Sequence, residues 1–355
     1  MATTTLALEN KKFLINGQPT HQGASFRGQS LEGLMFNSRM IQAIFDDHNP
    51  ETQAKWAYPD TGVWDAERNT AEFCAMLPVY RAHGLLAVTV GLQGGGSVYT
   101  KEIFPNVDNT AFNADGTLRP DYFARLEKVI DAADAAGMVV IVNYFYFGQE
   151  KRFTDEAAMF AAATNATEWL LAKGYKNVML DVKNEIQIGD GLLATGGVHR
   201  MINHIRDVSG PGLLIGTSTF PMPDINHLPD GQFYDVVDFL MPHGNNSEPD
   251  AWRRELEIFL ADPRVAGKPV LCNEDSTYVA NLDVSAELGV SWGYYDQGYG
   301  CGMRHGKQDW QLQDRETRFE DLSGYQTLPI NWGINTDDKR AFFGRIKELS
   351  EGNAA

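Results

Sequence analysis

Two short apolar runs of this 355-residue chain end in the same polar dipeptide. Residues 178–186 read Val-Met-Leu-Asp-Val-Lys-Asn-Glu-Ile, and residues 269–276 read Pro-Val-Leu-Cys-Asn-Glu-Asp-Ser. Both runs are typical of buried strands in a parallel sheet, which holds its ligand site at the carboxyl ends of the strands. Burying a carboxylate costs free energy unless the group is paired or hydrogen-bonded. The two strand-end glutamates, Glu185 and Glu274, therefore favour a functional explanation.

The spacing of the two glutamates predicts how many strands separate them. Glu185 and Glu274 are 89 positions apart, which corresponds to about three strand–helix units of ~30 residues each. Apolar strand-like runs alternate with amphipathic helical runs along the chain, a pattern that indicates a parallel sheet. We therefore predict an α/β fold, a single (β/α)8 TIM barrel spanning residues 1–355. Glu185 would end its fourth strand and Glu274 its seventh.

The remaining strands and helices follow from the same alternation. A hairpin at 13–19, within residues 1–20, should cap the bottom of the barrel, with its turn at Asn16–Gly17. Long loops after strands one and eight, at 28–68 and 297–336, should lie on the face where barrel active sites are built. The other predicted strands are 21–26, 85–92, 138–144, 213–216, 236–241 and 290–295. The predicted helices are 69–82, 122–136, 155–172, 199–207, 250–260, 283–288 and 337–349.

The charge of the chain argues against two kinds of partner. Thirty basic residues against 47 acidic ones leave a formal charge of −17, so nucleic acid and anionic membranes are poor partners. A neutral ligand such as a sugar is compatible with this charge. The chain has no apolar run that could span a bilayer and does not start with a signal-peptide pattern. We expect a cytoplasmic protein if the chain is full-length, and a secreted or periplasmic one if a signal peptide was removed.

The sequence favours neither a metal nor another cofactor. Cys74, Cys272 and Cys301 form no Cys-x-x-Cys pair and are expected to be reduced thiols. The histidines lack ligand spacing, since His199 and His204 would point away from each other on a helix. The glycine run after Gln93 lacks the Lys-Ser/Thr of a phosphate loop.

Two carboxyl groups that face each other at the mouth of a barrel are the catalytic groups that a glycosidase uses. In a retaining enzyme one carboxylic acid protonates the leaving oxygen, and a carboxylate ~5–5.5 Å away attacks the anomeric carbon. Glu274 has Asn273, Asp275 and Ser276 as polar neighbours, which makes it the better candidate for an ionised nucleophile.

The two Asn-Glu strand ends resemble the signature of the clan A glycoside hydrolases, and the chain resembles a family 5 (cellulase-like) member from about His21 to its end. The resemblance implies that Glu185 is the acid/base, that Glu274 is the nucleophile and that a carbohydrate, by default β-linked, is the substrate. It also implies an arginine near the nucleophile, a histidine on strand six and a tryptophan under the sugar, for which the candidates are Arg27, His243 and Trp292. Other predicted substrate contacts are Gln93, Tyr144, Asn184 and Tyr294.

Two positions depart from the family pattern and leave the substrate open. Asn245 stands where the family has a tyrosine, and residues 143–149 lack a histidine found at the end of strand three. A transglycosylase with the same intermediate and a catalytically silent carbohydrate-binding barrel are the alternative functions. An isomerase or aldolase would need a lysine or metal ligands at strand ends. Lys183 ends strand four, but its alternation with Asn184 predicts that it faces the helices.

Overall fold

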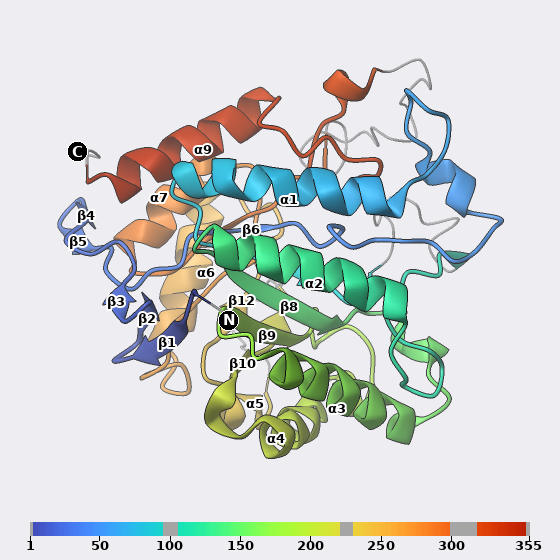
Figure 1. Cartoon of the computed structure of the whole chain (residues 1–355). Helices are drawn as coiled ribbons and strands as arrows, with labels where there is room; N and C mark the ends of the chain where they lie inside the picture. Colours follow the sequence, from blue (N-terminus) through green and yellow to red (C-terminus); the bar gives the residue numbers. More distant parts are fainter. Residues whose placement is uncertain (1–2, 95–105, 221–229, 299–317, 353–355) are drawn as a thin grey trace.

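The computed structural model describes residues 3–94, 106–220, 230–298 and 318–352. Six parallel strands form the central sheet in the order β10-β9-β8-β7-β6-β13. Their bounds are β6 (Asn37–Arg39), β7 (Ala87–Gly91), β8 (Val139–Phe145), β9 (Val178–Lys183), β10 (Leu214–Gly216) and β13 (Gly293–Tyr294). Of these, β6, β8, β9 and β10 are labelled in Figure 1.

Short pairings close this sheet into a barrel. After β10 the chain continues into β11 (Ser218–Thr219), which pairs in parallel with β12 (Met241–Pro242). Parallel bridges from Leu240 to Val270 and from Leu271 to Ser291 then connect the sixth, seventh and eighth strand positions. Because β13 pairs with β6, the circle is complete. The prediction of a (β/α)8 barrel is confirmed.

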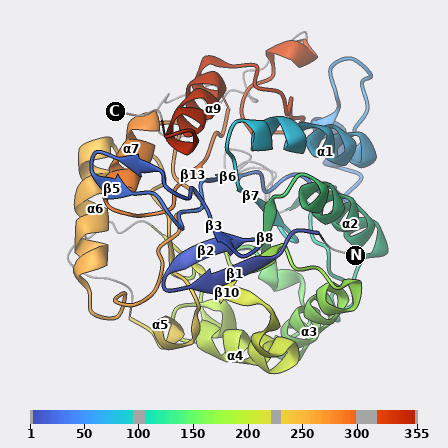
Figure 2. The same ribbon diagram turned by 60° about the vertical axis from the view of Figure 1, so that its left-hand side comes forward.

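Helices surround the strands on the outside (Figure 2). Three of them begin at a side chain that accepts a hydrogen bond from the first turn, namely Asp65, Asp155 and Thr336. None of the described helices is both long enough and apolar enough to cross a membrane. The helices are α1 (Ala66–Ala82), α2 (Pro120–Ala135), α3 (Glu156–Lys173), α4 (Val198–Ser209), α5 (Phe233–Val236), α6 (Pro249–Ala261), α7 (Val279–Glu287) and α9 (Asp337–Ser350). Short 3-10 turns occupy Gln53–Trp56, Glu150–Arg152, Gly191–Leu193, Gly210–Gly212 and Phe319–Asp321.

The barrel strand β8 is buried on both faces. Val140 and Val142 of β8 belong to the large core between strands and helices, whereas Val139 and Ile141 belong to a smaller core inside the barrel. The period of two residues that separates these faces is that of any strand. Because both faces of β8 are apolar over Val139–Val142, this strand reads as a continuous apolar run in the sequence.

An antiparallel sheet covers the amino-terminal end of the barrel (Figure 2). It consists of β1 (Leu6–Glu9), β2 (Lys12–Ile15) and β3 (Gln18–Pro19). Phe13 of β2 is buried in the inner core, with its ring 5.9 Å from that of Phe239. Asn16 and Gly17 both have positive φ, as the tight turn of such a hairpin requires.

The first barrel strand is not at residues 21–26, and this prediction was wrong. Residues 25–26 form β4 (Ser25–Phe26), which pairs with β5 (Gln29–Ser30) in a separate hairpin. The barrel strand is β6, whose three residues Asn-Ser-Arg are all buried. A strand of such residues has little β-propensity, and the barrel environment compensates by binding its polar groups. For example, Asn37 Nδ2 donates to the carbonyl oxygens of Cys272 and Trp292.

Candidate active site

The carboxyl ends of strands four, six and seven bring two glutamates and a histidine together. His243 Nδ1 lies 3.0 Å from Oε1 of Glu185 and 3.4 Å from Oε2 of Glu274. One side-chain atom from each of the three residues fits within 4.8 Å of the other two. All three residues are buried, with exposed fractions of 7% or less. Two carboxylates thus face each other around one imidazole nitrogen.

A buried arginine from β6 joins this cluster. Arg39 Nε lies 2.8 Å from Oε2 of Glu274, and its Nη2 donates to Oδ1 of Asn184 at 2.7 Å. The ring of Tyr295 lies 5.9 Å from the guanidinium carbon. Arg39 therefore supplies the positive charge that a buried carboxylate requires.

A chain of hydrogen bonds fixes the tautomer of His243. Its Nε2 lies 2.9 Å from Oδ1 of Asn273, whose Nδ2 donates to Asp181 at 3.4 Å. Asp181 in turn accepts from the backbone N–H and the hydroxyl of Ser218. Since an amide oxygen only accepts, Nε2 of His243 carries a proton. Nδ1 then carries a second proton only in the imidazolium, so one proton is shared between His243 Nδ1 and Glu185 Oε1.

The charges of the cluster decide where this proton resides. Burial lowers the pKa of His243, but the carboxylates of Glu274 and Glu185 outweigh it and raise the pKa above the ordinary 6.5. Burial opposes ionisation of Glu185, yet hydrogen bonds from His243 and Asn245 lower its pKa. Burial raises the pKa of Glu274, against the attraction of Arg39. In the free site the shared proton therefore belongs to His243, with Glu185 ionised.

Comparison with known proteins shows which solved structures share the fold of this chain. No protein-family model and no curated protein sequence matches the chain. Among solved structures, a glycoside hydrolase family 5 mannosidase from Rhizomucor miehei superposes with a TM-score of 0.56 at 13% identity, covering 99% of this chain and 98% of that one. A GH5-4 broad specificity endoglucanase from an uncultured bovine rumen ciliate gives a TM-score of 0.54 at 12% identity, covering 90% and 96%. The chain has the fold of the family 5 glycoside hydrolases.

Other structures with the same barrel are larger than this chain. A β-glucuronidase from Ruminococcus gnavus superposes with a TM-score of 0.53 at 11% identity, covering 97% of this chain and 52% of that one. The superposition thus spans about half of the β-glucuronidase chain. The resemblance inferred from the sequence is confirmed for the fold.

Within this family 5 fold, four of the predicted residues meet at the barrel mouth: Asn184, Glu185, His243 and Glu274. Gln93 lies nearby and is buried, with its Oε1 accepting from the backbone N–H of Tyr146 at 3.3 Å. Asn245, the departure from the family pattern, donates to Oε1 of Glu185 at 2.6 Å.

Four other predicted substrate contacts lie away from the mouth. Arg27 is exposed and pairs with Glu287, because the strand it was expected to end is not part of the barrel. Tyr144 bonds Thr167 of α3 through its hydroxyl. Trp292 and Tyr294 do share one face, as expected, but this face points to the helices. The ring of Tyr294 stacks on Phe342 of α9 at 4.3 Å, and both residues are fully buried.

Three residues near Glu274 were missed. Arg39 occupies the place expected for Arg27, and recognising β6 as a strand would have identified it. Tyr295 follows the misassigned Tyr294 and lies on the opposite face, near Arg39. Tyr146 lies beyond the end of β8, and burial together with the charge of Glu274 raises the pKa of both tyrosines.

A carboxylate behind the cluster fixes strands seven and eight. Asp275 is fully buried, and its Oδ2 accepts from Trp292 Nε1 at 2.6 Å and from Asn281 Nδ2 at 2.8 Å. Burial raises the pKa of Asp275 to about 7. The indole of Trp292 therefore supports the segment that carries Glu274 instead of forming a floor for a sugar.

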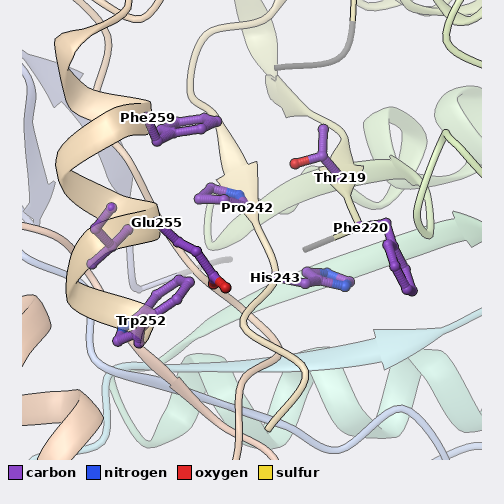
Figure 3. Close-up of a pocket in the computed structure, with 8 residues that line it drawn as sticks. Thr219, Phe220, Pro242, His243, Trp252, Glu255 and Phe259 are labelled. Atoms are coloured by element: carbon purple, nitrogen blue, oxygen red, sulfur yellow. The ribbon is translucent and has the colours of Figure 1, made fainter. Parts of the chain in front are cut away.

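A small pocket lies behind His243, between α6 and the ends of β11 and β12 (Figure 3). Glu255 of α6 points into it, accepts from the hydroxyl of Ser247 and has its pKa raised by burial. Because this pocket is on the helix side of the strands, it is not the place for a substrate at the two glutamates. Its lining residues are Thr219, Phe220, Pro242, His243, Trp252, Glu255, Leu256 and Phe259.

Within the part of the chain that the structure describes, two clusters have the residue types of a metal site. One is the Glu185–His243–Glu274 cluster, and the other consists of Asp46, His48 and Asp121. Each already contains a guanidinium. Arg39 lies 2.8 Å from Glu274, and Arg125 Nη2 lies 3.5 Å from both aspartates. A neighbouring fixed cation repels a metal ion, so neither cluster favours one.

Proposed function

We propose that the chain is a retaining glycoside hydrolase that acts on a carbohydrate, most simply a β-linked one. The observation that carries the proposal is the approach of the Glu185 and Glu274 carboxylates to within 4.8 Å. Retaining glycosidases separate their carboxyl groups by ~5–5.5 Å, whereas inverting ones leave ~6.5–9.5 Å for a water molecule. The family 5 fold supports the same reading.

In the first step Glu274 attacks the anomeric carbon and the bond to the leaving oxygen breaks. Oε2 of Glu274 faces Arg39 and His243, so Oε1 is the oxygen left for the attack. Formation of the ester removes the negative charge that raises the pKa of His243. As this charge is lost, the proton of His243 passes over 3.0 Å to Glu185, which delivers it to the leaving oxygen while the bond to the anomeric carbon breaks.

In the second step Glu185 takes a proton from water and returns it to His243. The hydroxide that forms attacks the anomeric carbon, and Glu274 leaves as a carboxylate. Asn184 is held through its oxygen by Arg39, so its amide N–H group is the donor offered to a sugar hydroxyl. With its one proton returned and Glu274 ionised again, the cluster is ready for another turnover.

Covalent labelling tests this function. The protein is treated with activated 2-deoxy-2-fluoro glucosides, mannosides and glucuronides and then analysed by intact mass and peptide mapping. We expect one adduct, on Glu274, and none with Glu274→Gln, which should also lose turnover while unfolding at nearly the same temperature. An adduct on Glu185 would reverse the two roles. A glycoside that is hydrolysed with inversion would refute the retaining mechanism.

The same labelling experiment distinguishes a hydrolase from the two alternative functions. A transglycosylase would form the adduct but pass the sugar to an added acceptor, which product analysis detects. A silent carbohydrate-binding barrel would bind glycans without adduct or turnover.

A further inference from the structure

A buried lysine holds the loop that carries Glu185. Lys183 ends β9, and its ammonium group donates to the carbonyl oxygens of Asn184 at 2.8 Å, Glu185 at 3.4 Å and Ile188 at 3.3 Å. From the sequence we expected only that Lys183 faces the helices, and its contacts with this loop were not predicted. Its ammonium group turns onto the loop at the mouth of the barrel.

The backbone of Glu185 is in a conformation that needs such support. Its φ is +53°, in the left-handed region that residues other than glycine seldom adopt. On one side its N–H donates to the hydroxyl of Ser218 at 3.1 Å, and the next N–H, of Ile186, donates to the Ser218 carbonyl. On the other side lie the carbonyls held by Lys183. The peptide units before and after Glu185 are therefore fixed from opposite directions.

The donors of Lys183 match the acceptors of the loop in number. An ammonium has three N–H groups and three carbonyls surround it. In the described ranges, no other donor reaches the carbonyl oxygen of Asn184 or of Ile188. Burial lowers the pKa of Lys183 to about 8, against the attraction of Glu150, Glu185 and Asp181. The side chain remains charged at neutral pH, which strengthens the three bonds.

We propose that Lys183 is a positioning residue for proton delivery to the leaving group. By fixing the backbone on both sides of Glu185, it keeps Oε1 of the carboxylate 3.0 Å from Nδ1 of His243. The inference rests on the proposed function, in which Glu185 is the acid/base. Lys183 acts through Glu185 and through no contact of its own with substrate.

A second buried lysine provides a matched control. Lys339 of α9 is also fully buried, and it donates to the carbonyls of Asn331 and Gly333 and to Oδ1 of Asn335. Burial lowers the pKa of Lys339 to about 7. Its chemistry is that of Lys183, but its hydrogen bonds hold a loop that carries neither glutamate.

The experiment compares leaving groups. Rates are measured for wild type, Lys183→Met, Lys183→Gln, Lys339→Met and Glu185→Ala with 2,4-dinitrophenyl and phenyl glycosides of the sugar that wild type hydrolyses. Dinitrophenolate departs without a proton, whereas phenolate needs one. We expect Lys183→Met to reduce kcat/KM for the phenyl glycoside at least about tenfold more than for the dinitrophenyl glycoside, as loss of general-acid catalysis would. Lys339→Met should lower the unfolding temperature without changing this ratio.

The outcomes separate the two hypotheses. Equal losses on both substrates in folded Lys183→Met, or the same change of ratio in Lys339→Met, would overturn the positioning role. Lys183→Gln retains an amide donor and decides the question if the methionine variant does not fold. Two results would refute the proposed function itself. One is that Glu185→Ala reduces kcat/KM equally for both glycosides, and the other is that wild type neither turns over a glycoside nor forms an adduct. In either case the role proposed for Lys183 is refuted as well.

Discussion

Arg39 and Glu274 form a buried ion pair in which Nε lies 2.8 Å from Oε2, and the same guanidinium donates to Asn184. One cation thus connects the strand that carries Glu274 with the strand that carries Asn184 and Glu185. Its side chain is 1% exposed and that of Glu274 is 10% exposed. Removing one partner of such a pair leaves the other as an uncompensated buried charge.

The first prediction concerns this pair. Arg39→Met should lower the free energy of unfolding by about 3–5 kcal/mol, the usual result of breaking a buried pair. It should also raise the pKa of Glu274 further, since the attraction of Arg39 opposes the rise caused by burial. Glu274, the proposed nucleophile, would then be protonated over a wider pH range, and activity at neutral pH should fall at least about a hundredfold. Urea denaturation and kcat/KM measure the two effects.

Arg27→Met is the control for this prediction. Arg27 is also an arginine paired with a glutamate, but its side chain is 58% exposed and it lies outside the barrel mouth. Exposed pairs contribute about 0–1 kcal/mol, so activity and stability should hardly change. Equal effects of the two substitutions would contradict the assignment of Arg39 to the site.

The second prediction concerns Trp292. Replacing it with Phe removes the N–H that Asp275 accepts at 2.6 Å, and loss of a bond to a buried carboxylate should reduce the free energy of unfolding by about 1–3 kcal/mol. Because the indole is fully buried in the core beneath the helices, KM should stay within about twofold of wild type, a change of less than ~0.5 kcal/mol. Urea denaturation and steady-state kinetics decide this. A large rise in KM without loss of stability would restore the sugar-floor role.

The glutamates could be found from the sequence because their strands are apolar and end in polar residues. β9 is a clear apolar run, and Asn-Glu follows directly on it and on the apolar run at 269–272. Their distance in the sequence then determines their strand numbers, and a barrel brings all strand ends to one face. No comparable signal exists for Arg39. Its strand is Asn-Ser-Arg, and only the surrounding barrel makes those residues a strand.

The direction in which side chains point was harder to predict from the sequence than the position of the strands. In β13 both faces are buried, so hydrophobic alternation does not distinguish the face inside the barrel from the face under the helices. Trp292 and Tyr294 were assigned together to the wrong face, and Tyr295 was missed for the same reason. Lys183 shows a further limit. Its role depends on the left-handed backbone of Glu185, which local sequence does not reveal.

The third prediction is the pH dependence of kcat/KM. The proposed mechanism needs Glu274 ionised and one proton on the His243–Glu185 pair. Activity should therefore fall in acid as Glu274 is protonated and in alkali as the pair loses its proton. Burial raises the pKa of Glu274, which places the acid limb above pH 4.5. The carboxylates raise the pKa of His243 despite burial, which places the alkaline limb above pH 6.5. Each limb belongs to the coupled cluster, including Arg39 and Asp181, and not to one residue.

A pH series with an activated glycoside, over the range in which circular dichroism shows an intact fold, measures both limbs. An alkaline limb below pH 6.5 would show that His243 is neutral in the free enzyme, and the proton would then have to come from Glu185 alone.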